Sequence, residues 1–400
     1  MFEKIISDAN LQAAYLKIVE QFAAEKKGSR YHGLDNLFLK DFDLDSCELI
    51  KLIRQELQTK TEISPALAIK IPKKNNPEKF REIFVYNLKE RIKAQAIFQI
   101  LLPVFEKHFS DRLFSYRPGK PPYLAAKYFC RRYRDSFTQD YLFVVDLENY
   151  SDLIDHDLLL SYLSEIFVEE EVISTLKLFI GNKVYRSGTI EKLKQGLVQG
   201  VPLIAMFSNL YLSDLDFKYQ KKVPFYLRVG DDIAFFDRYP QKLEILKNNF
   251  VSDLQKKKLK VSESKQYFGP ANGEFSFLGY SFFQGLISLE KKYLKRIVLE
   301  WKNILSKQKL SDNKKDLFIK KIMFNPRSNY NFQFEKIIKD KSQINNSEQI
   351  KKVSEEFFKI MTKFFYTRYS PRNRRLLEDR LRSFGLKSLY FFYKKFHYER

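Results

Sequence analysis

The chain has 400 residues, 44% of them hydrophobic, so it can bury a sizeable core and is not a disordered tail. Lys and Arg outnumber Asp and Glu by 71 to 49. The resulting charge of +22 predicts a polyanionic partner, with nucleic acid first, although a basic surface kept for solubility is the other interpretation. Two cysteines without a CxxC pair argue against a zinc site or a disulfide framework, and no apolar run of about 18 residues predicts a membrane span. We therefore expect a cytoplasmic protein of one or two compact bodies, without membrane contact.

The N-terminal third begins with apolar residues at helical spacing over residues 2–57, interrupted by the polar turn at 26–33. Two β-rich segments follow, at 66–72 and 81–86. The Asn-Asn-Pro between them marks a turn, so together they predict a hairpin. Helical spacing then returns over residues 88–109.

The middle of the chain contains a run, DYLFVVDL, that predicts a buried strand ending near Asp146. A helix is expected directly after it, and helix capping explains the acids Asp152, Asp155 and Asp157 at its start. The segments PFYLRV and IAFFD predict a second hairpin, with Gly230, Asp231 and Asp232 at its turn.

The C-terminal region from Gly285 onward carries 29 Lys and Arg against 12 Asp and Glu, and its spacing predicts helices to the end. Within it, SPRNRRLLEDRLRSFGLKSLYFFYKK alternates cations with aromatic residues. This pattern is compatible with an RNA-gripping helix pair, and equally with a basic helix that covers the core. Under the first interpretation the nucleic-acid contacts include Arg372, Arg374 and Arg375.

Carboxylates at a strand end and at a hairpin tip suggest a metal site. If the two elements are neighbours in one sheet, Asp146, Asp231 and Asp232 could hold the two metal ions that assist phosphoryl transfer. Adjacent strand residues point to opposite faces, so we expect Asp231 to be the bridging ligand and Asp232 the weaker one. Asp is also a common turn residue, so the dipeptide alone is weak support.

The segments around these acids, from Ser64 to Tyr280, closely resemble in order the motifs of reverse transcriptases, particularly the bacterial group of group II intron, retron and phage-defence enzymes. In AIKIPKKNNPEKFREIFVY the resemblance implies that Lys73 or Lys74, and Arg81, contact the incoming triphosphate. In SYRPG it places Arg117 close to the template or nucleotide.

The metal-binding motifs of that family match VVDLENYSDLIDHDLL, which makes Asp146 a metal ligand beside the Leu147 carbonyl, and YLRVGDDIAFF, which contains Asp231 and Asp232. GLVQGVPLIAMFSN resembles the motif that places Gln199 and Gly200 beneath the nucleotide and the template base.

Two further motifs lie downstream. Lys265 stands where the family carries a lysine that can protonate the pyrophosphate leaving group, although a surface lysine in a lysine-rich stretch is the alternative. FSFLGY is similar to the hairpin that grips the primer end, which implicates Leu278 and Gly279.

Three departures from the family pattern stand out. Val229 replaces the usual aromatic residue, and Ile204 with Ala205 replaces Ser-Pro. Ser151 stands where the family places a bulky aromatic that excludes the ribose 2′-hydroxyl, and Tyr150 lies one position earlier. We hypothesise that sugar discrimination is weakened or is transferred to Tyr150, so that ribonucleotides can be accepted.

The resemblance implies an α+β right-hand polymerase with fingers, an antiparallel palm sheet with helices, and a helical basic thumb. The expected divisions are a helical extension at residues 1–63, fingers at 64–140, a palm at 141–284, and a thumb with a nucleic-acid-binding region at 285–400. Within the palm, a helical segment on the fingers side is expected at about 157–195.

The implied activity is RNA-directed DNA synthesis from deoxynucleoside triphosphates with two Mg²⁺ ions, for which Mn²⁺ is the alternative ion. The implied setting is phage defence, with a structured noncoding RNA as template or scaffold, a DNA product, and a homo- or hetero-oligomer with another reverse transcriptase. A template-independent terminal transferase and a catalytically silent RNA-binding scaffold are the alternatives.

Overall fold

The computed structural model describes residues 1–24, 33–35, 47–73, 76–308, 310–324, 334–385 and 387–398. The chain forms two compact units, and neither is a continuous stretch of sequence. The first unit comprises Met1–Ala125 and Tyr141–Gly269, and the second comprises Ala126–Asp140 and Pro270–Arg400. Helices and several small sheets are mixed in both, as the predicted α+β class requires.

The first unit begins with three helices that pack on a fourth, long helix: α1 (Phe2–Ile6), α2 (Asp8–Ala24), α3 (Cys47–Gln58) and α4 (Leu88–Lys107). Their apolar faces form part of one core, and the Asn10 side-chain amide joins α2 to α4 by donating to the Ala96 carbonyl at 3.1 Å. The helical prediction is confirmed here, whereas all of the predicted turn at 26–33 except Gly33 lies outside the described residues.

The predicted first hairpin is confirmed as β1 (Ala66–Lys73) paired antiparallel with β2 (Asn76–Val85). A second, unpredicted hairpin of β4 (Lys183–Arg186) and β5 (Thr189–Lys192) extends this sheet through a parallel pairing of β1 with β4, which gives the order β2-β1-β4-β5. The segment within 157–195 also contains α6 (His156–Ile166) and α7 (Glu170–Ile180).

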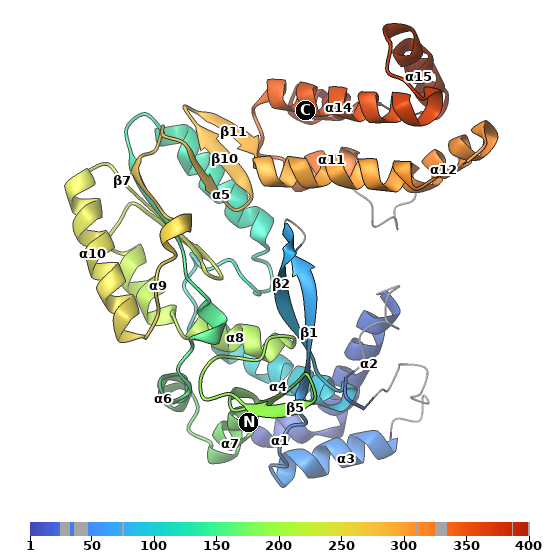
Figure 1. The fold of residues 1–400 in the computed structure, drawn as a ribbon. Coiled ribbons are helices and arrows are strands. Elements are labelled where there is room, and N and C mark those ends of the chain that lie inside the picture. The colour runs from blue at the N-terminus through green and yellow to red at the C-terminus, as the bar shows by residue number, and fades with distance from the viewer. Residues whose placement is uncertain are drawn as a thin grey trace. The chain divides into compact units, whose positions relative to one another are not determined.

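A second sheet of the first unit has the strand order β6-β7-β3-β8, formed by Phe225–Val229, Asp232–Asp237, Tyr141–Asp146 and Tyr267–Pro270. Helices α8 (Pro202–Leu210), α9 (Ser213–Gln220) and α10 (Pro240–Lys256) accompany it (Figure 1). Phe235 stacks on Phe143 with 5.5 Å between ring centroids and meets Phe250 edge-on at 5.1 Å. This aromatic core fixes the strands whose ends carry the predicted metal ligands.

Helix α5 (Pro122–Ser136) lies mostly in the second unit, against the sheet β11-β10-β9, formed by Leu286–Leu289, Tyr280–Phe283 and Phe275–Phe277. The Phe129 ring of α5 lies 4.6 Å from Phe277 and 5.2 Å from Phe282, measured between centroids. The β9–β10 connection is the hairpin expected from FSFLGY.

The rest of the second unit is helical, as expected: α11 to α16 span Lys291–Ser306, Asp312–Phe324, Phe334–Asp340, Ser347–Tyr366, Pro371–Ser383 and Leu389–Tyr398. Figure 1 shows α11 and α14 side by side, and the fully buried Trp301 meets Phe357 edge-on at 5.0 Å between them. Across the described ranges, no helix has the length and apolar character that a bilayer crossing needs.

Candidate active site

The predicted carboxylates meet because their strands are neighbours in one sheet, which confirms the condition set from the sequence. Asp146, the last residue of β3, pairs with Asp232, the first residue of β7, and the Leu147 N–H donates to the Asp231 carbonyl at 3.1 Å. The turn contains two residues and not three, because Asp232 already pairs with Val229. Gly230 takes a φ of +65°, a conformation that glycine adopts without strain.

One cavity of about 1050 Å³ in the first unit gathers most of the predicted site. Its lining includes eight of the residues singled out from the sequence: Asp146, Leu147, Tyr150, Ser151, Gln199, Gly200, Asp231 and Lys265. Asp232 does not line it. Segments more than 80 residues apart in the chain therefore contribute to a single cavity. Of the two adjacent aspartates, Asp231 is the one that lines it.

Lys265 binds directly to the strand-end carboxylate. Its Nζ lies 2.8 Å and 2.9 Å from the two carboxylate oxygens of Asp146. The chain is held in place for this contact because the Ser262 N–H donates to the Asp146 carbonyl and the Glu148 N–H donates to the Lys260 carbonyl. Partial burial lowers the pKa of Lys265, but the hydrogen bond to Asp146 and the three nearby carboxylates raise it overall, so the ammonium stays protonated.

Burial of the carboxyl and a neighbouring negative charge both act on Asp231 at the hairpin tip. Desolvation of the carboxyl, followed by the negative charge of Asp146, raises the pKa of Asp231, although that residue is exposed at the turn. A divalent cation would relieve this repulsion, and carboxylate oxygens are the ligands that Mg²⁺ prefers. Within the described ranges, no three His, Cys, Asp or Glu side chains are gathered into a ready-made metal cage. The donor type therefore fits a metal, with Lys265 as the cation now beside Asp146.

The floor of the cavity is built from the segments that match the nucleotide-binding motifs. The Gln199 amide donates to the Ser151 hydroxyl at 2.5 Å, which joins two of the predicted contacts. Tyr150 is buried, and its hydroxyl donates to the Ser208 carbonyl. Gly200 has a φ of +135°, and a Cβ there would meet the Phe84 carbonyl oxygen at 2.7 Å, so only glycine fits.

The altered residues Ile204 and Ala205 lie in α8, which begins with Pro202 in its first turn. Ile204 is buried, and both residues line the cavity. Their replacement of Ser-Pro therefore leaves a helix start that is compatible with the surrounding core.

A buried ion pair contacts the turn that carries Asp231, and the sequence argument missed it. Arg228 in β6 and Asp216 in α9 are both fully buried, with guanidinium–carboxylate distances of 2.6 and 2.8 Å. Arg228 also donates to the carbonyls of Asn209 at 2.9 Å and Gly230 at 3.3 Å. Burial alone lowers the pKa of Arg228, but the adjacent Asp216 charge raises it overall, so the guanidinium remains charged.

A second set of contacts continues this network to the turn. The Gly230 N–H donates to the Ser115 hydroxyl at 3.0 Å, the Ser115 hydroxyl lies 3.0 Å from the Asn209 side-chain oxygen, and the Asn209 amide donates to the Ser115 carbonyl at 2.8 Å. The sequence argument gave no role to Ser115. One signal was available: an arginine inside the apolar strand FYLRV must find a buried partner.

Among the predicted phosphate contacts, the structure describes the side chain of Arg81 alone, and Arg81 does not line this cavity. Arg81 is exposed on β2 opposite Ile71, and no carboxylate of the described chain pairs with it. For Lys73 the structure describes the backbone in β1 but not the side chain, and Lys74 lies outside the described residues.

The structure gives Arg117 an internal role. Its side chain is buried, binds Glu106 at 2.8 to 3.1 Å, and donates to the carbonyls of Ser110 at 2.6 Å and Leu113 at 3.1 Å. These bonds hold the loop before α5. The nucleic-acid contact predicted for Arg117 receives no support from this geometry, whereas the neighbouring Tyr116 is exposed and lines the cavity.

The predicted contacts in the second unit fall into two groups. Leu278 and Gly279 form the β9–β10 turn with φ values of +50° and +79°, the backbone that a two-residue type I′ turn requires. Arg372 and Arg375 are exposed on α15. Arg374 instead binds Glu355 at 2.6 and 2.7 Å and Glu378 at 3.1 Å, so three of its donors are committed to carboxylates.

Comparison with known proteins gives a consistent result. Residues 71–282, more than half of the chain, match the family model described as reverse transcriptase (RNA-dependent DNA polymerase). The chain is also similar to Protein YkfC of Escherichia coli strain K12, with 22% identity over 208 residues, which are 51% of this chain and 54% of YkfC. The chain thus spans about half the length of this curated relative. The matched region contains every residue that lines the large cavity except Gln21. This chain belongs to the reverse transcriptase family.

Proposed function

We propose that the chain synthesises DNA on an RNA template, with two Mg²⁺ ions held by Asp146, Asp231 and, more weakly, Asp232. The observation that carries the proposal is the single cavity that joins Asp146 and Asp231 to Lys265, Gln199 and Gly200. Two such ions would activate the primer hydroxyl and clamp the triphosphate of the incoming deoxynucleotide, and Mn²⁺ would substitute for them. The Leu147 carbonyl is the further ligand expected beside Asp146.

The remaining residues have separate tasks in this proposal. Lys265, whose ammonium contacts Asp146, would supply the proton that the departing pyrophosphate takes up. Arg81, together with Lys73 or Lys74, neutralises the triphosphate. Gln199 and Gly200 lie below the nucleotide. In the same proposal, fingers, palm and thumb correspond to residues 64–140, 141–284 and 285–400.

Sugar selection is expected to be relaxed. The small Ser151 is already engaged by Gln199, and Tyr150 is anchored to the Ser208 carbonyl, so no free bulky ring is described at the position that excludes a 2′-hydroxyl. Comparing the incorporation of ribonucleotides and deoxyribonucleotides by the full chain tests this hypothesis. A strong deoxyribonucleotide preference that persists in Tyr150→Ala would contradict it.

The biological setting that we propose is cytoplasmic phage defence with a dedicated noncoding RNA as template or scaffold, as in the bacterial reverse transcriptases that the motifs resemble. A homo- or hetero-oligomer with another reverse transcriptase belongs to the same proposal. Sequencing the RNA that co-purifies with the chain, and the DNA made from it, identifies the template directly.

Primer extension on a defined RNA template, with Mg²⁺ and each nucleotide set, tests the enzymatic proposal. We expect Asp231→Asn to reduce synthesis about a thousandfold or more, because the metal clamp supplies several kcal/mol of transition-state stabilisation. Asp157→Asn is the matched control, since Asp157 is exposed in the first turn of α6 and does not line the cavity. Synthesis retained by a folded Asp231→Asn would refute the site.

The same assay separates the two alternative functions. Products that ignore the template sequence would indicate a terminal transferase that uses the same carboxylates. Absence of synthesis by the natural chain, even with its co-purified RNA, would indicate an RNA-binding scaffold.

A further inference from the structure

A second cavity, which the polymerase chemistry does not use, lies among the C-terminal helices of the second unit. It has a volume of about 530 Å³ and is lined mainly by α14, α15 and α16. Pockets of roughly 300 to 1,000 Å³ commonly accept small organic groups. Four aromatic side chains contribute to its wall: Phe334, Phe358, Tyr390 and Phe391.

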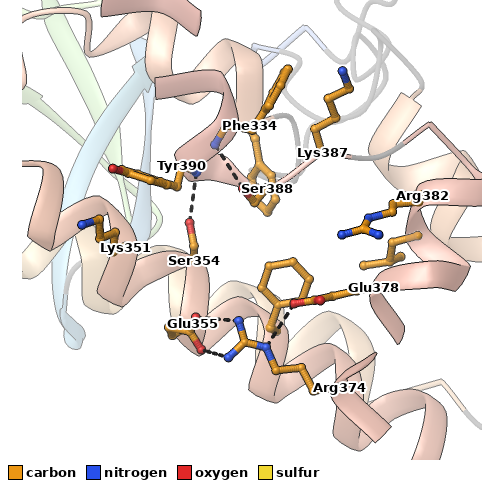
Figure 2. Close-up of a pocket in the computed structure, with 13 residues that line it drawn as sticks. Phe334, Lys351, Ser354, Glu355, Arg374, Glu378, Arg382, Lys387, Ser388 and Tyr390 are labelled. Atoms are coloured by element: carbon orange, nitrogen blue, oxygen red, sulfur yellow. Dashed lines mark hydrogen bonds and ion pairs between the residues drawn. The ribbon is translucent and has the colours of Figure 1, made fainter. Parts of the chain in front are cut away.

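The two carboxylates of this cavity are both used internally. Figure 2 shows Arg374 between Glu355 and Glu378 on one side, with Phe334, Ser388 and Lys387 on the other. Because Glu355 and Glu378 both bind Arg374, neither is left as an obvious site for a cationic ligand. This ion-pair cluster fixes α15 against α14.

Three further cations around the cavity keep their charge available. No carboxylate of the described chain lies within ion-pair distance of Lys351 or Lys387, and Arg382 has only a long 3.7 Å contact to Asp379, with both side chains about three-quarters exposed. Each of the three comes from a different part of the fold: α14, α15 and the segment before α16. The rim therefore presents a positive field that an anion can enter.

The cations lie beside the rings. Lys387 Nζ is 4.1 Å from the Phe391 ring centroid, and Lys351 Nζ is 5.2 Å from that of Tyr390. The start of α16 is fixed because the Tyr390 N–H donates to Ser354 Oγ at 3.1 Å and the Phe391 N–H donates to Ser388 Oγ at 3.0 Å. Flat apolar rings next to unpaired ammonium groups are the combination that binds a nucleobase and its phosphate.

We propose that this cavity holds an unpaired nucleotide of a single nucleic-acid strand, with its base against Tyr390 or Phe391 and its flanking phosphates near Lys351, Arg382 and Lys387. Residues 371–398 carry eight Lys and Arg against two Asp and Glu, so a strand leaving the cavity meets further cations, which a free mononucleotide would not use. The inference deepens the proposed function, on which it rests for the choice of nucleic acid as ligand.

Binding of a short fluorescein-labelled single-stranded RNA to the full chain tests the site, measured by anisotropy over a series of salt concentrations. We expect Phe391→Leu, which keeps an apolar side chain but removes the ring, to weaken binding about tenfold, as loss of one stacking contact does. Arg382→Gln with Lys387→Gln should lower the slope of log affinity against log salt by about 1.4, at about 0.7 per phosphate contact.

The charge-matched control is Lys295→Gln with Lys352→Gln, two exposed lysines of α11 and α14 that lie neither in the cavity lining nor within residues 371–398. It should change affinity less than twofold. Equal weakening by the two double variants would overturn the proposal, as would unchanged binding in a Phe391→Leu variant whose thermal unfolding matches the natural chain. Full competition by AMP would assign the cavity to a free nucleotide, and full competition by poly-glutamate would assign it to acidic peptide, and either result overturns the strand proposal.

Primer extension by the cavity variants at saturating primer and template separates this inference from the proposed function. We expect the cavity variants to synthesise DNA at nearly the rate of the natural chain while binding single-stranded RNA more weakly. If the natural chain makes no product yet binds the strand through Phe391, the polymerase proposal fails and the cavity proposal stands.

Discussion

Two regions of the chain use their charges differently: the buried network of the first unit and the C-terminal helices of the second unit. In the first unit, Arg228 and Asp216 are fully buried and bonded to each other, and Lys93 lies buried between Glu90 and Glu56. In the helical part of the second unit, ion pairs such as Arg374–Glu355 remain partly exposed, and cations such as Lys387 have no carboxylate partner within the described ranges.

Buried, paired charges hold neighbouring groups in position, whereas exposed, unpaired charges attract a charged ligand. A buried, paired charge is costly to remove and holds its neighbours in one arrangement, which suits a turn that must present Asp231 at a fixed place. An exposed, unpaired charge contributes little to stability and remains free to bind phosphate. Charge substitutions in the two units should therefore have different consequences, in stability for one and in binding for the other.

The largest effect is expected from Arg228→Met, because it leaves the Asp216 carboxylate buried and unpaired. We expect the free energy of unfolding to fall by about 3 to 5 kcal/mol, measured by urea denaturation. Adding Asp216→Leu should restore much of this stability without restoring synthesis, since methionine cannot donate to the carbonyls of Gly230 and Asn209. A double variant with normal primer extension would show that the ion pair does not position the turn.

A smaller effect is expected from Asp253→Asn in the first unit. Burial raises the pKa of Asp253, but hydrogen bonds from Lys218, Tyr219 and Lys256 outweigh it and bring the pKa down to about 2 from 3.8. Since the pKa is lower in the folded state, the stabilisation is complete well above pH 4 and is lost as the pH falls toward 2. The variant should thus lose about 2 kcal/mol at pH 7, at 1.36 kcal/mol per pKa unit.

Urea titrations at a series of pH values check this prediction, with Asp379→Asn as the exposed control of the second unit. The control should stay within about 0.5 kcal/mol of the natural chain. A loss at pH 7 that persisted unchanged near pH 2 would mean that the carboxylate charge is not the cause.

The smallest effect on stability is expected from Arg372→Gln combined with Arg375→Gln, because both side chains are exposed on α15. Unfolding should change by less than about 0.5 kcal/mol. Affinity for single-stranded RNA should nevertheless fall, with the salt slope reduced by about 0.7 for each phosphate contact removed. Strong destabilisation by the Arg372→Gln, Arg375→Gln double variant would contradict the view that exposed charges of the C-terminal helices contribute little to stability.

Local patterns in the sequence were sufficient for the elements that carry the site. Alternating and continuous apolar runs located β3 and the β6–β7 hairpin, and the Gly-Asp turn followed from the residues that hairpins require. The order of motifs, and not any single residue, identified Gln199, Gly200 and Lys265 as members of one site. All three line the cavity that Asp146 and Asp231 also line.

The contacts that join distant segments could not be obtained in this way. The parallel pairing of β1 with β4 brings together segments more than a hundred residues apart, and periodicity carries no information on such partners. Likewise, Ser115 is an ordinary loop serine in the sequence, and only the folded chain shows its hydroxyl at the Gly230 N–H. The sequence also assigned Arg117 to nucleic acid, whereas the structure uses its donors within the protein.

The packing of α5 on the β9–β10–β11 sheet has a consequence for how the chain is made. Phe129 and Tyr133 leave the ribosome well before Phe275 and Phe282, the rings that cover them. At about 5 to 20 residues per second, this aromatic face waits on the order of ten seconds for its partners. The second unit therefore cannot finish folding before the first has been fully synthesised. A chain cut at residue 269 would leave the exposed face of α5 as a site for aggregation, not a smaller stable protein.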